Sequence, residues 1–210
     1  MKAFIEPLIL YAILFLPSGQ SGAGDFVTFS AAGEVFRIVL YNIPSLALVW
    51  YLLLKVRSLK AWGVGLPRRE DLAAGLLALP SLVLTGFVIA AVSPLFQNIP
   101  EGPRLAPPSD VSGWLILVVS CISTGYLEES FFRFYLLSRR DEFGLSAAAA
   151  AFVSVASFAF CHVYEGPWGF LNAVLAGSVL SFLFLRYRAL HGLAFAHGLY
   201  NTLVYVFSLF

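Results

Sequence analysis

Long apolar stretches separated by short polar ones run through the chain. Six of them, residues 38–54, 72–92, 114–137, 143–162, 166–185 and 190–210, approach or exceed the roughly 20 apolar residues that a membrane-spanning helix needs. A seventh stretch, residues 4–16, is shorter and contains Glu6 and Pro7. The pattern predicts an all-α fold, a polytopic membrane helix bundle of about seven transmembrane helices.

The short first stretch has two interpretations. Lys2 precedes it and the polar sequence "PSGQSGAG" follows it, as in a cleaved signal peptide, which would leave six transmembrane helices. Glu6 is unfavourable at the start of a signal peptide's apolar core, so we expect a retained helix. A length of 210 residues suits one bundle, and we treat residues 1–210 as a single transmembrane domain.

Basic residues alternate between successive connections and predict an orientation. The connections after the apolar stretches 38–54, 114–137 and 166–185 are basic. The connection after residues 72–92 has only Arg104, and the connection "VYEG" has no basic residue. The basic residues are Lys55, Arg57, Lys60, Arg68, Arg69, Arg139, Arg140, Arg186 and Arg188. Positive residues favour the cytoplasmic side, so seven helices place the N-terminus in the cytoplasm and the C-terminus outside.

Composition agrees with a protein embedded in the lipid bilayer. Hydrophobic residues make up 60% of the chain and charged residues 12%, against about 25% charged in soluble domains. A net charge of +1 without a basic stripe indicates no nucleic-acid partner. Cys121 and Cys161 both lie in apolar stretches, so a disulfide framework is not indicated.

Charged residues interrupt the apolar stretch 114–137 in the sequence "EESFFR". Ionisable groups are costly in hydrocarbon and usually functional there. On a helix Glu129 and Arg133 face each other and can pair, whereas Glu128 points about 100° away. A carboxylate partly removed from water can act as a general base near neutral pH. The competing explanation is a buried ion-pair cluster that only fixes helix packing.

Two further polar pairs favour chemistry. "FAFCH" places His162 at the end of the fifth apolar stretch, and "HGLYN" places His197 and Asn201 on one face of the last. Glu128 can then take a proton from water that His162 orients, while His197 and Asn201 stabilise the oxyanion, worth roughly 10²–10³ in rate per donor. His191, beside the basic connection, is interpreted as an interfacial residue without a function.

Two short protease-like motifs are rejected. "GQSG" at residues 19–22 matches a serine-protease motif and "GAGD" at residues 22–25 an aspartyl-protease motif. Both fall in one polar, glycine-rich turn outside the long apolar stretches, and Asp25 has no second intramembrane aspartate to pair with. The zinc-binding pattern HExxH is absent.

Three motifs together resemble a known family. "EESFFR", "FAFCH" and "HGLYN" fit, in order, the EExxxR, FxxxH and HxxxN motifs of the CAAX protease and bacteriocin-processing (Abi/CPBP) family of intramembrane proteases. The resemblance implies that Glu128 and His162 activate water and that His197 and Asn201 form the oxyanion hole. It assigns Glu129 and Arg133 a supporting role. We place the catalytic core at about residues 114–205.

The resemblance also implies a substrate class and a location. Family members cleave prenylated C-termini, peptides or membrane-anchored tails, so the expected partners are a membrane-anchored protein or peptide and the bilayer itself. The short chain favours a prokaryotic plasma membrane protein. A transporter or a scaffold without catalysis, each using the buried charges structurally, is the alternative, although paired repeats of broken helices are not evident.

A metal and the depth of the site remain open at this level. Zinc could bind Glu128, His162 and His197, but the spacings match no zinc-binding helix, and we favour no cofactor. Counted from the cytoplasmic connections at 1.5 Å per residue, His162 lies about 10 Å deeper than Glu128. The fifth helix must therefore be tilted or must begin within the cytoplasm.

Overall fold

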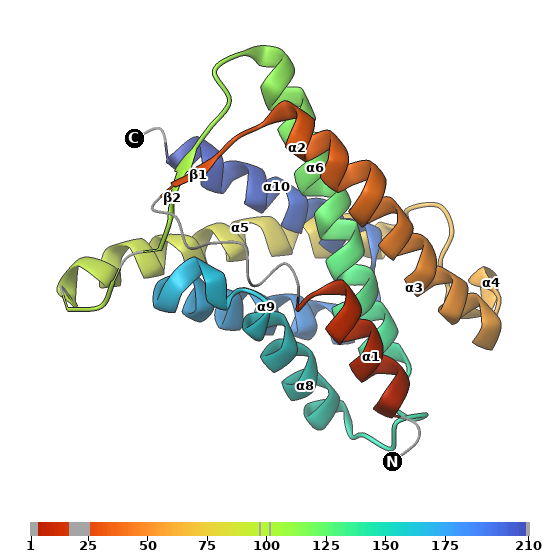
Figure 1. Cartoon of the computed structure of the whole chain (residues 1–210). Helices are drawn as coiled ribbons and strands as arrows, with labels where there is room; N and C mark the ends of the chain where they lie inside the picture. The colour runs from red at the N-terminus through yellow and green to blue at the C-terminus, as the bar shows by residue number, and fades with distance from the viewer. Residues whose placement is uncertain (1–3, 17–25, 97, 101, 209–210) are drawn as a thin grey trace.

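The computed structural model describes residues 4–16, 26–96, 98–100 and 102–208 (Figure 1). The helices and strands in chain order are α1 (Ile5–Leu14), β1 (Phe26–Thr28), α2 (Ala31–Phe36), η3 (Arg37–Asn42), α3 (Ile43–Val56), α4 (Leu59–Trp62), α5 (Arg69–Val92), η4 (Ser93–Leu95), β2 (Arg104–Ala106), α6 (Val111–Glu128), η5 (Glu129–Tyr135), α7 (Leu136–Ser138), α8 (Ala147–Phe160), η6 (Val163–Glu165), α9 (Gly166–Tyr187) and α10 (His191–Phe207). The predicted all-α bundle is confirmed, and a helix lies within each of the predicted apolar stretches.

Helix ends differ from the predicted ones where a polar side chain caps the helix. The second apolar stretch is preceded by α2, whose first turn is capped by the Ser30 hydroxyl accepting from the Gly33 N–H. Asp110 caps α6 in the same way through the Gly113 N–H, at 2.8 Å. Such side chains satisfy N–H groups that a helix cannot pair internally, so they decide where it begins.

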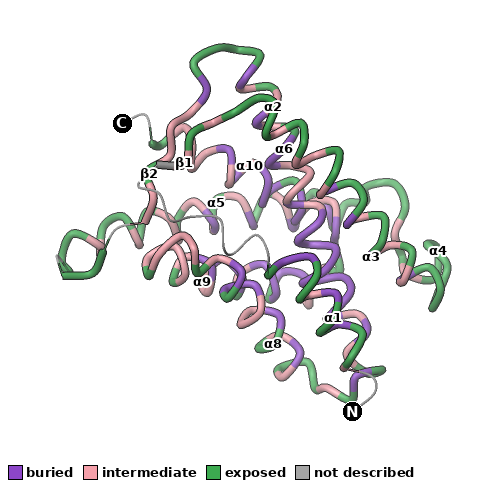
Figure 2. Tube along the Cα trace, in the orientation of Figure 1, coloured by how far each residue is buried: buried purple, intermediate pink, exposed green. Residues whose placement is uncertain are grey.

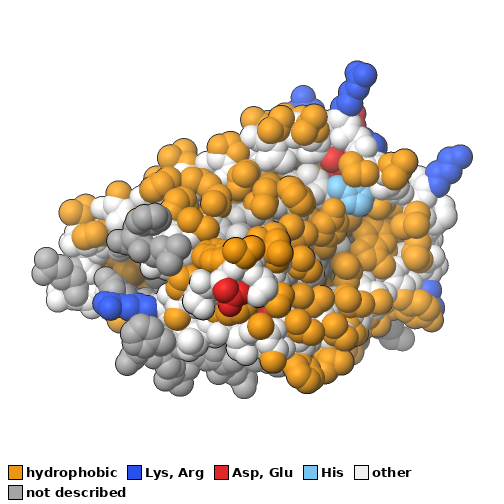
Figure 3. Space-filling view, turned by 90° about the horizontal axis from the view of Figure 1, so that it is seen from above, with side chains coloured by type: hydrophobic (Ala, Val, Ile, Leu, Met, Phe, Trp, Pro, Cys, Tyr) orange, Lys and Arg blue, Asp and Glu red, His pale blue; other side chains and the backbone are white. Residues whose placement is uncertain are grey.

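Among the residues that the structure describes, four continuous helical segments are long and apolar enough to cross a membrane. They are Ala31–Val56, Arg69–Leu95, Val111–Ser138 and Val163–Tyr187, whereas α1 and α8 are shorter apolar helices. Hydrophobic side chains cover much of the face seen in Figure 3, as expected for a surface in contact with lipid. The chain is thus an integral membrane protein by helix length and composition; seven crossings and their orientation remain predictions.

A small parallel sheet was not predicted. β1 pairs with β2, with Val27 opposite Leu105, in segments that we interpreted as connections. Strands of three residues leave no recognisable alternation of apolar and polar positions, which explains the omission. The rejected "GQSG" and "GAGD" motifs lie outside the residues that the structure describes.

The stretch "ESFFRFY" forms the π-helix η5, where a regular α-helix was expected. Single π-helical turns inside α-helices are rare overall, but those that occur often lie at functional sites. All its residues are buried, and Figure 2 shows the buried positions concentrated where α6 continues into η5, while α3 and α4 are more exposed. The wider turn therefore lies at the centre of the molecule.

Close packing of α10 against α6 determines the geometry of this centre. In Figure 1, α6 runs beside α2 and α3, and α5, α9 and α10 cross behind it. A Cβ atom on Gly198 would lie 2.5 Å from Ile122 Cα, and one on Gly125 would lie 2.5 Å from the Ala194 oxygen. Because these two glycines let the backbones approach, α10 brings His197 to Glu128 at the end of α6.

Candidate active site

The predicted ion pair between Glu129 and Arg133 is present at the start of η5. Both side chains are fully buried, and Arg133 Nη1 lies 3.0 Å from Glu129 Oε1. The guanidinium also stacks over the Phe158 ring, 4.4 Å from its centroid, and Nη2 lies 3.4 Å from the Gly177 oxygen. Arg133 thus connects η5 with α8 and α9.

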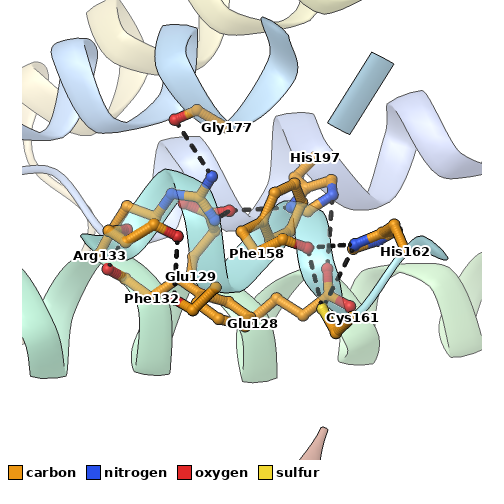
Figure 4. A network of polar contacts seen from close by, with 11 residues as sticks. Glu128, Glu129, Phe132, Arg133, Phe158, Cys161, His162, Gly177 and His197 are labelled. Carbon is orange, nitrogen blue, oxygen red and sulfur yellow. Dashed lines mark hydrogen bonds and ion pairs between the residues drawn. The ribbon is translucent and has the colours of Figure 1, made fainter. Parts of the chain in front are cut away.

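His197 contacts both glutamates, a contact that the sequence did not predict. Its Nδ1 lies 2.9 Å from Glu129 Oε1, and its Nε2 lies 3.5 Å from Glu128 Oε2 (Figure 4). An ionised carboxylate only accepts hydrogen bonds, so Nδ1–H donates to Glu129 and Nε2 faces Glu128. Glu129 therefore holds the orientation of His197 as well as the charge of Arg133.

His162 lies immediately after α8, where Figure 4 shows it near His197 and Glu128. Its Nδ1 lies 2.7 Å from the Phe158 oxygen and therefore donates to it, leaving Nε2 as the nitrogen able to accept. Its ring centroid is 4.5 Å from that of Phe158, and it interacts electrostatically with Glu128.

The helix that precedes His162 is inclined to the helix that carries Glu128, and a tilt is one of the two arrangements expected from the sequence. α8 contains 14 residues, about 21 Å of helix, and Figure 1 shows it inclined to α6. The Ser154 hydroxyl donates to the Phe132 oxygen at 2.6 Å, and Phe158 packs on Arg133. α8 therefore runs antiparallel to η5 and ends beside Glu128.

Asn201 is the one predicted site residue without a contact to the others. It lies one turn beyond His197 on α10 and is partly exposed. Its amide forms no hydrogen bond within the part of the chain that the structure describes. The structure thus brings Glu128, Glu129, Arg133 and His197 into one cluster, with His162 adjacent and Asn201 at its edge.

His191 has a structural role that our interpretation of it as merely interfacial missed. Its Nδ1 lies 3.2 Å from the Tyr126 hydroxyl, and its Nε2 lies 2.9 Å from the Gly65 oxygen. The Asp71 carboxylate, itself buried, accepts from the His191 backbone N–H at 2.9 Å. These bonds attach the start of α10 to α6 and to the connection before α5.

Several polar atoms of the cluster lack partners. Among the described residues, Glu128 Oε2, Glu129 Oε2 and Arg133 Nε are buried without a hydrogen bond. With both glutamates ionised, the three side chains carry a net charge of −1, which a protonated His197 would neutralise. Buried polar groups are costly unless paired, so this concentration of them at the end of α6 indicates a site for reacting groups.

The three residues considered for zinc do not form a ligand cluster. No group of three His, Cys, Asp or Glu side chains in the described residues could hold a metal ion. His197 and His162 use Nδ1 for bonds to Glu129 and to the Phe158 oxygen, which leaves Nε2 of each ring as the nitrogen that a metal would bind. A reaction without a metal therefore stays a prediction.

Comparison with known proteins identifies the segment that carries the site. Residues 110–203 match a family model described as "Type II CAAX prenyl endopeptidase Rce1-like". No curated protein and no solved structure matches the chain. The matched segment contains Glu128, Glu129, Arg133 and the motif histidines, and it confirms the resemblance to the CAAX-protease family. Residues 110–203 are therefore similar to the Rce1-like CAAX prenyl endopeptidases.

Proposed function

We propose that the protein is an intramembrane endopeptidase in which Glu128 activates water to cleave a peptide bond of a membrane-anchored protein or peptide. One observation carries this proposal: Glu128 has a buried carboxylate oxygen without a hydrogen-bond partner, 3.5 Å from His197 Nε2. The neighbouring acid, Glu129, is already bound to Arg133 and His197, so Glu128 is the carboxylate left to react.

The proposed reaction moves one proton through Glu128. Its carboxylate takes a proton from a water molecule that His162 Nε2 helps to orient, and the water oxygen bonds to the substrate carbonyl carbon. The negative charge that develops on the carbonyl oxygen is stabilised by hydrogen bonds from His197 and Asn201. Glu128 then returns its proton to the departing amine nitrogen, and the carbon–nitrogen bond breaks.

Glu129 determines which form of His197 can serve in this scheme. Because Nδ1–H donates to Glu129, Nε2 can donate to an oxyanion only when the imidazole carries both protons. When both glutamates are ionised, that form of His197 balances the charges of Glu128, Glu129 and Arg133. Glu129 and Arg133 therefore act through His197 and do not touch the substrate.

The substrate class follows from the family and the setting. The matched family model is named for prenyl-protein endopeptidases, so a peptide tethered to the membrane by a lipid is the substrate class that we propose. A prenylated cysteine followed by two aliphatic residues and a C-terminal residue is the first probe to use. An unlipidated peptide of the same sequence tests whether the lipid is needed.

Glu128→Gln tests the proposed function directly. The purified protein in phospholipid vesicles would be assayed with a fluorogenic prenylated peptide and its unlipidated counterpart. The amide keeps the shape of the side chain and removes the base, and a general base contributes about 10²–10⁴ in rate, so cleavage should fall by that factor. Glu70→Gln, an exposed acid at the start of α5, is the control. Equal cleavage by wild type and Glu128→Gln would refute the proposal.

A further inference from the structure

The last turn of α8 is partly buried, at Phe158 and Ala159, and its carbonyl groups need hydrogen-bond partners. The final four carbonyl groups of an α-helix have no regular intrahelical N–H donor. Where water is excluded it cannot replace the missing donors, and each unsatisfied group costs several kcal/mol. Which groups bind the carbonyls of residues 157–160 therefore decides how this turn, and His162 after it, is held.

The described contacts account for three of these carbonyls. The Ala159 oxygen accepts from the His162 N–H at 3.0 Å, and the Phe158 oxygen accepts from His162 Nδ1 at 2.7 Å. The Ser157 oxygen accepts from the Tyr11 hydroxyl of α1 at 2.8 Å, and from the Cys161 N–H at 3.3 Å. A side chain from the first helix, outside the family-matched segment, thus caps the turn that carries His162.

Tyr11 is held firmly by its own surroundings. Its ring packs edge-on against Phe132 at 6.3 Å, and the neighbouring Phe15 packs on Phe132 at 4.6 Å. At the other end of α1, the Glu6 carboxylate is bound by Arg139 at 2.6 Å and by the Tyr135 hydroxyl. α1 is therefore fixed to η5, the same segment that begins with Glu129.

We propose that Tyr11 is a positioning residue for the active site: by bonding the Ser157 carbonyl, it fixes the last turn of α8 relative to η5 and so sets the place of His162 beside Glu128. The inference rests on the proposed function, because it assigns His162 a part in the reaction. Without the hydroxyl, the Ser157 oxygen keeps only the longer bond from Cys161, and the turn loosens.

Tyr11→Phe isolates the hydroxyl, because the ring that packs on Phe132 remains. A displacement of 1 Å at a reacting group can cost about 10²-fold in rate, so a loosened turn should lower kcat by roughly tenfold with KM unchanged. Backbone amides of residues 160–162 should exchange with deuterium faster, at normal protein abundance.

Tyr41→Phe is the matched control. It removes a second tyrosine hydroxyl that binds a backbone carbonyl, that of Leu14 at the end of α1. Its kcat should stay near the wild-type value. If Tyr41→Phe lowered kcat as much as Tyr11→Phe, general loosening of α1 would explain both and the inference would be wrong.

A double variant separates this inference from the proposed function. If Tyr11 acts through His162, Tyr11→Phe should have no further effect in a His162→Ala background. The same loss in both backgrounds, or wild-type kcat in Tyr11→Phe, would overturn the inference. Glu128→Gln in the same assay is the separate arm: its full activity would refute the function, whereas its inactivity beside an active Tyr11→Phe would refute the inference alone.

Discussion

The two adjacent glutamates of "EESFFR" have different environments. Glu129 is bound to Arg133 and His197, whereas the Glu128 carboxylate lies 3.5 Å from His197 Nε2. Removing one partner of a buried ion pair costs about 3–5 kcal/mol, because the other charge is left unpaired. Glu129→Gln and Arg133→Leu should therefore lower abundance in the membrane and thermal stability as well as activity.

Glu128→Gln should lower activity at nearly normal abundance and stability, since no buried cation depends on this carboxylate alone. Quantitative immunoblots of membranes and thermal unfolding of the purified variants measure the difference. Normal abundance of all three variants would show that the division of roles between the glutamates is wrong.

Asn201 tests the proposed oxyanion hole most cleanly, since its amide has no other hydrogen bond in the described structure. Asn201→Ala should lower kcat by roughly 10²-fold with little change in KM, as for other oxyanion-hole donors. Phe195→Ala, on the exposed side of the same helix, is the control. A raised KM with unchanged kcat would place Asn201 in substrate binding instead.

His197→Ala and His191→Ala should differ in kind. His197→Ala removes a proposed donor and also leaves Glu129 with only Arg133, so kcat and stability should both fall. His191→Ala breaks the ring bonds to Tyr126 and Gly65, so stability should fall while the kcat of the folded fraction persists. Comparable losses of kcat per folded molecule would mean that the catalytic histidine was misidentified.

Treatment with a chelator tests whether cleavage depends on a metal ion bound by the site residues. The proposed mechanism uses only side chains, so cleavage should persist after exhaustive treatment with a strong chelator. Elemental analysis of the active, purified protein checks that no bound metal escaped the treatment. Loss of activity that zinc restores would contradict the metal-free scheme.

At the scale of helices, two glycines bring the site together. The backbones of α6 and α10 touch at Gly125 and Gly198, and an added Cβ at either would lie 2.5 Å from the opposite helix. Gly198→Ala should therefore separate His197 from the glutamates, lowering activity and costing about 1–3 kcal/mol of stability as overpacking does. Thermal unfolding and the peptide assay measure both effects.

Gly65→Ala is the matched control for this substitution, because a Cβ there would have no neighbour within 4 Å. It should leave activity and stability near the wild-type values. A harmless Gly198→Ala would mean that α10 can shift without moving His197 away from its partners.

At the scale of the whole molecule, the basic connections predict which side each end of the chain faces. α1 begins and α10 ends at opposite ends of the molecule in Figure 1. A phosphatase reporter that is active only outside the cytoplasm should be active when fused after Phe210 and inactive when inserted at Gly63. The reverse result would invert the orientation.

The sequence by itself determined the features that depend on local order. The lengths of the apolar stretches predicted the helices, the four-residue spacing predicted the Glu129–Arg133 pair, and three motifs in order predicted the family. These predictions were confirmed because helix periodicity and i,i+4 contacts require only the residues of one segment. The single-domain reading and the roles of the site residues remain predictions.

Only the tertiary structure decided the contacts between segments far apart in the chain. The bond from His197 to Glu129 joins residues 68 positions apart, and that from Tyr11 to Ser157 joins residues 146 apart. Such contacts depend on how closely helices pack, which Gly125 and Gly198 permit and no pattern within one helix reports. The physical reason is that packing is a property of two surfaces at once, whereas a sequence pattern describes only one.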